Sequence, residues 1–276
     1  MKLLLGCDPE VFVREKGKKR YFTSAHGLNE GTKDVPVRVE CGAVQVDGMA
    51  LEFNIDPAAT EDEWFHNITT VMNIMKTSLP DNLEIVATPV ALFTKKHLAE
   101  QPLEAKELGC TPDYNAWKKG EANPRPNAEV NFRTGAGHIH FGWCENADVS
   151  DPLHLEACMI LTQALDLTLA PLCALFDTGY KRRELYGAPG AFRPKPYGCE
   201  YRVVSNAWLR DEETIRWVYK VSHAVFNALC AGKVLNYSAY KPTLLDTLSR
   251  KTMTPAQRER VLWRTDMLGL PKLNKW

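Results

Sequence analysis

Two histidines lie two residues apart in a glycine-rich stretch, Gly135–Gly142, that the pattern predicts to be a short strand. Side chains alternate between the faces of a strand, so His138 and His140 share one face and Ile139 and Phe141 the other. The polar face could bind a metal ion or phosphate, or the imidazoles could bond to neighbouring carbonyl groups. The flanking glycines favour a ligand, because a residue without a side chain lets a ligand approach the backbone.

Three carboxylates on other predicted strands, Glu10, Glu52 and Glu200, stand between strongly apolar neighbours. Burying a carboxylate is costly unless it is paired or bound to metal. If these strands lie side by side, the carboxylates repel one another, and a divalent cation offsets that repulsion. Oxygen ligands with an imidazole suit Mg²⁺ or Mn²⁺ better than zinc. The alternative is three separate salt bridges, for example between Glu200 and Arg202 or Arg182.

Basic residues gather in and just beyond a glycine- and proline-rich stretch, residues 181–196, which we expect to be a loop. Arginine matches phosphate and carboxylate oxygens with two parallel hydrogen bonds, so a nucleoside triphosphate would suit this stretch. The alternative is a solvated basic loop with one or two acidic partners. The sequence contains neither standard glycine-rich phosphate-binding pattern. The basic residues are Arg182, Arg183, Arg193, Lys195 and Arg202.

The composition is that of an ordinary globular protein, with 276 residues, 45% hydrophobic and 25% charged. The formal net charge is zero, so no global basic field indicates nucleic-acid binding, although a local patch stays open. No apolar run is long enough to predict a membrane span. The eight cysteines are scattered, and we expect free thiols in a reducing cytoplasm.

The elements that must position these residues follow from periodicity and turn residues. A capping box at Thr60 predicts a helix that ends near Ser78, and Asp47-Gly48 predicts the turn of a hairpin. Residues 102–126 show little periodicity, and we expect them to be a long connection that sets substrate specificity or forms a lid. Strands are expected over 3–13, 43–55, 83–93, 129–132, 136–143 and 197–204, and further helices over 151–176, 211–231 and 254–268. The sum predicts an α+β fold: one mainly antiparallel sheet with helices on its apolar face.

At these residues the chain resembles the carboxylate–amine ligases of the glutamine synthetase and glutamate–cysteine ligase superfamily. It is most similar to the amidoligases called COOH·NH2 ligase type 2, many of which tailed bacteriophages encode. The most specific pattern lies in the last of four matching segments. It contains Arg182-Arg183, Tyr186-Gly187 and Phe192-Arg193, followed by Glu200-Tyr201-Arg202. These segments are Gly6–Phe12, Gly42–Pro57, Gly135–Gly142 and Arg182–Leu209.

The resemblance implies a curved, mainly antiparallel sheet with helices packed on its convex face and ATP with divalent cations on its concave face. ATP would phosphorylate a carboxylate, and an amine would attack the acyl phosphate. The substrates would be small-molecule or peptide acids and amines, and the enzyme would work in the cytoplasm, that of the host cell if a phage encodes it. We expect one catalytic domain over 1–276, with the motifs in 6–209 and a helical part in 210–276.

The resemblance also assigns roles to individual residues. Arg202 and Arg193 would stabilise the transferred phosphoryl group. In the first strand this chain has Asp8 where the glutamate–cysteine ligase type has glutamate, so Asp8 binds metal or the site holds fewer ions. Two other functions stay open: a phosphotransferase of guanidino-kinase type, and a non-catalytic phage protein that binds metal or nucleotide. The metal ligands would be Glu10, Glu52, Glu200 and His138, and the nucleotide contacts His138, His140, Asn54, Lys195 and Arg182.

Overall fold

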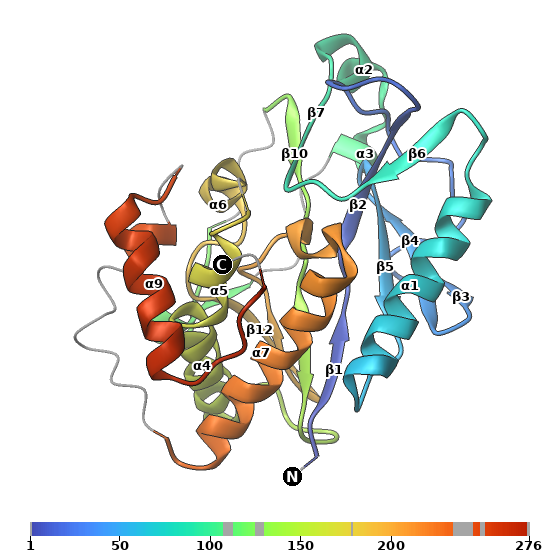
Figure 1. Cartoon of the computed structure of the whole chain (residues 1–276). Helices are drawn as coiled ribbons and strands as arrows, with labels where there is room; N and C mark the ends of the chain where they lie inside the picture. Colours follow the sequence, from blue (N-terminus) through green and yellow to red (C-terminus); the bar gives the residue numbers. More distant parts are fainter. Residues whose placement is uncertain are drawn as a thin grey trace.

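A computed structural model gives the fold of the chain (Figure 1), and it describes residues 2–106, 113–124, 130–177, 179–233, 245–248 and 252–274. Runs of strands and runs of helices follow one another along the chain, and every strand pair in the described part is antiparallel. The predicted α+β class with mainly antiparallel strands is therefore confirmed. The strands form three sheets, however, and not the single sheet that we expected.

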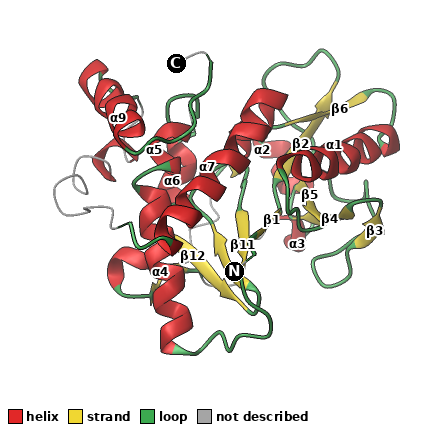
Figure 2. Ribbon diagram, turned by 60° about the horizontal axis from the view of Figure 1, so that its bottom comes forward, coloured by secondary structure: helices red, strands yellow, loops and turns green. Residues whose placement is uncertain are grey.

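A six-stranded sheet carries the predicted histidine strand next to one of its edge strands. Helix α4 (Pro152–Asp166) packs against its strands β12 and β13, and helix α7 (Glu212–Cys230) packs against α4. Figure 2 shows both helices beside strands β11 and β12. In spatial order the strands are β1 (Leu4–Cys7), β11 (Ile139–Gly142), β13 (Gly198–Tyr201), β12 (Ala191–Lys195), β8 (Tyr114–Asn115) and β9 (Glu121–Ala122).

A five-stranded sheet carries the predicted hairpin. Its strands β4 and β5 meet at the two-residue turn Gly48–Met49, as Asp47-Gly48 predicted, and helix α1 (Glu61–Ser78) packs against both. A third sheet pairs β7 (Val90–Leu92) with β10 (Phe132–Thr134). In spatial order the five strands are β3 (Val37–Val39), β4 (Gly42–Asp47), β5 (Ala50–Ile55), β2 (Glu10–Glu15) and β6 (Leu83–Val86).

The chain crosses between the two large sheets at Asp8-Pro9. The strand expected over 3–13 is two strands, because β1 belongs to the six-stranded sheet and β2 to the five-stranded one. Proline has no N–H to donate to a ladder, so a break at Pro9 costs no backbone bond. Its carbonyl group still accepts a hydrogen bond from the N–H of Phe53 at 3.2 Å. Asp8 consequently lies at the seam where side chains from both sheets can meet.

Helix α1 has the predicted limits and core face. The Thr60 hydroxyl accepts from the N–H of Glu63 while the Glu63 carboxylate accepts from the N–H of Thr60, which completes the capping box. Trp64, Ile68, Val71 and Met75 are buried, as the helical spacing predicted. Trp64 stacks on Trp208, with ring centroids 5.7 Å apart, so the helix fixes the segment that follows β13.

Three other predictions of elements were wrong in the described residues. The strand over 83–93 is divided into β6 and β7 on either side of Pro89. The helix over 151–176 ends at Asp166, and a short helix, α5 (Leu169–Cys173), follows Thr168, whose φ and ψ of −130° and −75° are not helical. The loop expected over 181–196 contains most of helix α6 (Tyr180–Leu185) and all of strand β12.

The connection over 102–126 also holds regular structure where it is described: helix α3 (Leu103–Lys106), a 3-10 turn η1 (Ala116–Lys118) and the β8–β9 hairpin. Residues 107–112, 125 and 126 lie outside the described part. The helices predicted over 211–231 and 254–268 are confirmed as α7 and α9 (Pro255–Met267). The remaining short elements are α2 (Lys95–Glu100) and the 3-10 turn η2 (Asn206–Arg210).

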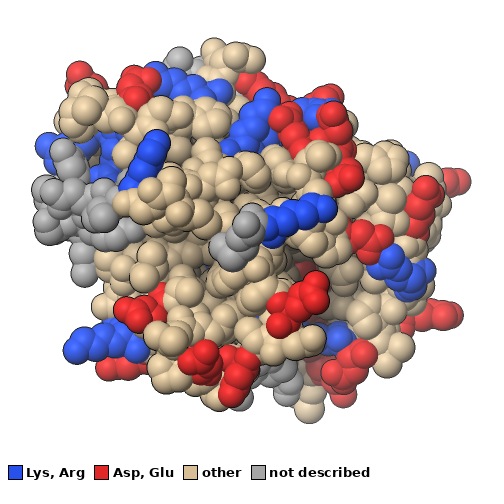
Figure 3. Space-filling view, turned by 90° about the horizontal axis from the view of Figure 1, so that it is seen from below, with Lys and Arg blue, Asp and Glu red and all other residues tan. Residues whose placement is uncertain are grey.

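One described helical stretch, Pro152–Cys173, is long and apolar enough to cross a membrane. Two thirds of its most apolar window (67%) is buried inside the protein, and a buried core helix meets the same criterion. Acidic and basic side chains are interspersed on the face seen from below (Figure 3). The seven cysteines in the described part of the chain are free thiols.

Candidate functional site

Three carboxylates meet on the five-stranded sheet. Glu10 of β2 lies directly opposite Glu52 of β5, and the ligand oxygens of both lie within 4.8 Å of an oxygen of Asp47. Burial, followed by the charge of Asp47, raises the pKa of Glu10 to about 7. Burial and the neighbouring carboxylate of Asp8 likewise raise the pKa of Glu52 well above its usual range. Together, the three carboxylates have the chemistry to hold a divalent cation.

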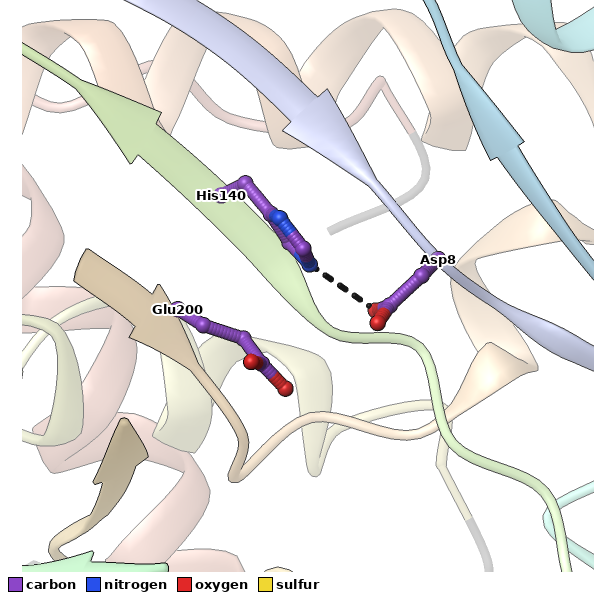
Figure 4. Close-up of side chains that lie close together, drawn as sticks. All are labelled: Asp8, His140 and Glu200. Atoms are coloured by element: carbon purple, nitrogen blue, oxygen red, sulfur yellow. Dashed lines mark ion pairs between the residues drawn. The ribbon is translucent and has the colours of Figure 1, made fainter. Parts of the chain in front are cut away.

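A second group forms on the six-stranded sheet from Asp8, His140 and Glu200, whose ligand atoms also lie within 4.8 Å of one another. His140 of β11 is the cross-strand neighbour of Glu200 of β13, and Asp8 follows β1 on the other side. Figure 4 shows the three side chains converging from these adjacent segments. His140 Nε2 lies 3.0 Å from Asp8 Oδ1, yet both atoms are buried without a well-directed hydrogen bond. A carboxylate oxygen and an imidazole nitrogen that are both buried without a hydrogen-bond partner fit coordination of one shared metal ion.

The pKa values of the two histidines are shifted in opposite directions. Burial and the guanidinium of Arg202 lower the pKa of His138 to about 4, so His138 is neutral near pH 7. Burial acts against protonation of His140 as well, but the carboxylate of Asp8 outweighs it and raises the pKa of His140. His138 Nδ1 lies 3.2 Å from Asp8 Oδ1 and 3.4 Å from Glu200 Oε1. Both imidazoles therefore face the same carboxylates, as the strand parity predicted.

Three cations surround the fully buried carboxylate of Glu200. Lys195 Nζ lies 3.0 Å from Oε2 and Arg193 Nη1 3.3 Å from it, while Arg202 contacts Oε1. Although burial opposes ionisation, Arg202 holds the pKa of Glu200 well below its usual range. Arg202 is also held by Asp113, with Nε 3.3 Å from Oδ2. The salt bridge to Arg202 that we kept as an alternative thus exists, within a larger ion-pair network.

Two pockets open on either side of these groups, and both are lined by Asp8 and Glu52. The arginine pocket sets the carboxylates and His138 against a wall of cations. The aromatic pocket is larger and mixes apolar, aromatic and amide side chains. The cations of the arginine pocket are Lys33, Arg133, Arg182, Arg193 and Arg202, and the distinctive residues of the aromatic pocket are Leu4, Gln45, Asn54, Ile55, Pro57, His140, Trp143 and Tyr197.

Tyr197 of the β12–β13 turn contacts the site from the aromatic pocket. Its hydroxyl lies 2.5 Å from His140 Nδ1, and the two rings stack with centroids 5.9 Å apart. The N–H groups of Trp143 and Cys144 donate to the Tyr197 carbonyl oxygen at 2.9 and 3.2 Å, which fixes the turn. A Cβ on the next residue, Gly198, would lie 2.1 Å from the Phe141 carbonyl oxygen, so only glycine allows this close approach.

Gly135 and Gly137, which precede the histidines, are required by packing. We had expected these glycines to let a ligand approach the backbone. A Cβ on Gly137 would lie 2.3 Å from the Ser205 carbonyl oxygen, and one on Gly135 would lie 2.4 Å from Asn206 Nδ2. They admit the segment after β13, whose Trp208 donates from Nε1 to the Gly137 carbonyl oxygen at 3.0 Å. The approach of a ligand to the backbone is therefore not needed to explain them.

The structure brings together most of the predicted site residues, but it divides the expected metal ligands. Glu10 and Glu52 join Asp47, whereas Glu200 and His138 face Asp8. His140 and Asn54 line the aromatic pocket, and Arg182 lines the arginine pocket. Arg183 lies apart and pairs with Asp177 at 3.2 Å. The sequence analysis assigned no role in the site to four contributors, Asp47, Asp113, Arg133 and Tyr197, although Asp47 lies in the matching segment Gly42–Pro57.

A family model agrees with the resemblance over part of the chain. Residues 123–242 match the family model described as phage phiEco32-like COOH·NH2 ligase type 2. No curated protein matches the chain. Among solved structures, a bifunctional glutathione synthetase from Pasteurella multocida matches 98% of this chain at 11% identity with a TM-score of 0.42. A glutamine synthase homologue matches 95% of this chain at 12% identity with a TM-score of 0.41.

This chain covers 47% of the glutathione synthetase and 67% of the glutamine synthase homologue. It thus spans about half the length of the first of them. The family match extends from the β9 region through the histidine strand and the Glu200 strand.

Proposed function

We propose that this protein is an ATP- and Mg²⁺-dependent carboxylate–amine ligase that forms an amide bond through an acyl phosphate. One observation carries the proposal: two side-chain groups fit for metal binding lie between an arginine pocket and an aromatic pocket, and both pockets share Asp8 and Glu52. A reaction between an acid and a nucleotide needs two binding sites that meet at a cation. Both substrates would be small molecules or peptides, and we place the enzyme in the cytoplasm, of the host if a phage encodes it.

The nucleotide suits the aromatic pocket. Apolar and aromatic side chains there would cover a purine and ribose, and the amides of Asn54 and Gln45 would offer hydrogen bonds. His140 and Lys195 stand where the pocket reaches the ion-pair network of Glu200, beside which the triphosphate would lie. The proposed nucleotide contacts are therefore His140, Asn54 and Lys195, with His138 toward the phosphates.

The residues present fit divalent cations. Asp8, His140 and Glu200 would hold one ion, and Glu10, Asp47 and Glu52 a second, with neutral His138 beside the first. Bound Mg²⁺ or Mn²⁺ would neutralise charge on the phosphate oxygens. The carboxylates with raised pKa values give up protons when such an ion binds, which couples metal affinity to pH.

The acid suits the arginine pocket, where its carboxylate oxygen would attack the γ-phosphorus and ADP would leave. Arg202 and Arg193 would neutralise charge on the transferred phosphoryl group, and their ion pairs with Glu200 hold them in place beforehand. The amine nitrogen would then attack the acyl carbon and lose a proton, and phosphate would leave. The chain's own contribution is to orient both reactants and to place positive charge where negative charge develops.

Trapping with hydroxylamine tests this proposal, because hydroxylamine converts an acyl phosphate to a hydroxamate. With ATP, Mg²⁺ and a panel of carboxylic acids, a ligase releases ADP and phosphate and yields a hydroxamate from its own acid. A guanidino-kinase-type enzyme would release ADP only when a guanidino compound is supplied as the phosphoryl acceptor, and it would form no hydroxamate, whereas a non-catalytic protein would release no ADP in either case. The Glu200→Gln variant should be inactive, whereas Glu184→Gln, at an exposed carboxylate outside the site, should match the wild type.

A further inference from the structure

The three carboxylates of the five-stranded sheet, those of Glu10, Asp47 and Glu52, already have a cation beside them. Lys33 Nζ lies 2.9 Å from Asp47 Oδ2. The charge of Lys33 also acts on both glutamates, where it opposes the rise in pKa that burial causes. One ammonium therefore compensates part of the negative charge of this group, as a bound metal ion would.

Lys33 is held less firmly than two arginines of the same pocket. Arg193 and Arg202 pair with the fully buried carboxylate of Glu200. The side chain of Lys33 is 46% exposed, and that of Asp47 is 24% exposed. A lysine ammonium has a flexible stem, and an ion pair this exposed is weak, so the ammonium can leave Asp47 at little cost.

The backbone that carries Lys33 is anchored on both sides. The Gly31 carbonyl oxygen accepts a hydrogen bond from the N–H of Val46 at 2.9 Å. On the other side, Val37 begins strand β3, which pairs with β4. The exposed residues 32–35 lie between these two anchors. The backbone thus keeps Lys33 at the arginine pocket, which it lines, while the side chain can change its contact.

A divalent ion held by the three carboxylates would oppose the contact between Lys33 and Asp47. Carboxylate oxygens bind Mg²⁺ at about 2.0–2.1 Å, so the ammonium would lie within about 7 Å of the ion whichever oxygen of Asp47 binds it. Like charges at that distance repel one another, and a partly buried site screens them less than bulk water does. The bound ion and the Lys33–Asp47 pair therefore disfavour each other.

We infer that Lys33 is a further catalytic residue, which leaves Asp47 when a divalent cation binds the three carboxylates and then contacts the γ-phosphate of the nucleotide. The inference rests on the proposed ligase function and adds a mobile cation to it. Lys33 lines the arginine pocket together with Arg193 and Arg202, so its ammonium can reach a phosphoryl group that these arginines bind. The arginines hold their charge in place beforehand, whereas Lys33 would supply its charge only after the metal ion has bound.

Two binding measurements on Lys33→Met, made in the whole protein, test the inference. One is Mn²⁺ titration followed by electron paramagnetic resonance, and the other is calorimetric titration of a non-hydrolysable ATP analogue at saturating Mn²⁺. Without the competing ammonium, the variant should bind Mn²⁺ at the three carboxylates about two- to five-fold more tightly. Without the phosphate contact, it should bind the analogue about ten-fold less tightly. A structural defect would instead weaken the binding of both.

Three controls complete the test. The Mn²⁺ ion at the three carboxylates is identified as the one that Glu52→Gln no longer binds. Lys33→Arg should recover most of the affinity for the analogue, because it restores a cationic donor at this position. Lys18→Met, at an exposed lysine that lines neither pocket, should match the wild type in both measurements.

A crystal structure of the wild type with Mn²⁺ and the analogue should show the Lys33 ammonium at hydrogen-bonding distance from a γ-phosphate oxygen and away from Asp47. An ammonium still paired with Asp47 in that complex would overturn the inference. So would a Lys33→Met variant whose affinity for Mn²⁺ does not rise or whose affinity for the analogue does not fall, and either result would leave the proposed ligase function intact. Wild type that binds no analogue at saturating Mn²⁺ would count against the proposed function and the inference together.

Discussion

Glu10 and Glu52 face each other directly across strands β2 and β5, with Asp47 beside both. Like charges directly opposite in an antiparallel pair destabilise a sheet. Nothing in the sheet requires carboxylates at these positions, since their strand neighbours Val11, Leu51 and Phe53 supply the core. The pair is thus a cost to the fold that cation binding would offset, and it connects the stability of the protein to its proposed function.

The first prediction concerns stability without metal. In the presence of a chelator at pH 8, Glu52→Gln should raise the free energy of unfolding by about 0.2–1 kcal/mol, because it removes a like-charge pair. A carboxyl whose folded pKa is raised, as that of Glu52 is, stabilises the protein below its unfolded pKa, near 4.5, and this contribution is lost as pH rises through the folded pKa. The gain should therefore shrink toward pH 4.5, as urea titrations at several pH values would show.

Glu40→Gln serves as the control for this experiment, because Glu40 is exposed on the β3–β4 turn. Its free energy of unfolding should match that of the wild type at both ends of the pH range. A Glu52→Gln variant that is less stable than the wild type at pH 8 without metal would contradict the carboxylate repulsion.

The second prediction concerns metal. Saturating Mg²⁺ should raise the melting temperature of the wild type, by about 5 °C at a hundred-fold excess over Kd. The rise should be larger at pH 8 than at pH 6, because Glu10, with a pKa of about 7, is largely protonated at pH 6 and a proton competes with the cation. An equal rise at both pH values would show that the cation binds elsewhere.

A third prediction concerns Tyr197 and His140. The hydroxyl of Tyr197, 2.5 Å from Nδ1, holds the imidazole so that Nε2 faces Asp8. Loss of such an outer partner typically weakens metal binding about 10- to 100-fold. Mn²⁺ titration followed by electron paramagnetic resonance should show this loss in Tyr197→Phe and none in Tyr21→Phe, at an exposed tyrosine. An unchanged affinity would mean that the hydroxyl does not orient His140.

The fourth prediction separates packing from ligand approach at the glycines. Gly137→Ala should destabilise the protein by about 1–3 kcal/mol, because its Cβ would overlap the Ser205 carbonyl oxygen and Trp208 Nε1. Gly142→Ala, at the end of strand β11, should not destabilise, since the nearest neighbour of the added Cβ would lie at an ordinary 3.5 Å. Chemical denaturation of the two variants tests the contrast, and equal stability would refute the packing role.

Local signals predicted local structure well. The capping box set the limits of α1, the Asp47-Gly48 turn set the β4–β5 hairpin, and strand parity put His138 and His140 on one side. Each of these depends on residues within one turn or hairpin, where backbone geometry alone decides which side chains meet.

The division of the metal-binding residues into two groups could not be predicted. It depends on strand pairing between segments far apart in the chain, such as β11 with β13 and β2 with β5. The passage between sheets at Asp8-Pro9 could not be predicted either, because a proline in a strand gives no sign of where the next strand pairs. Asp113 and Arg133 carried no periodic signal, and they reach the site only through the tertiary arrangement.

The most direct test of the central claim is calorimetric titration of ATP, with and without Mg²⁺, into the wild type and Glu52→Gln. We expect binding to the wild type that requires Mg²⁺, and a loss of that binding in the variant, because Glu52 lines both pockets and belongs to one metal-binding group. Folded wild type that binds no ATP, even with a panel of carboxylic acids present, would contradict a metal–nucleotide site at this seam.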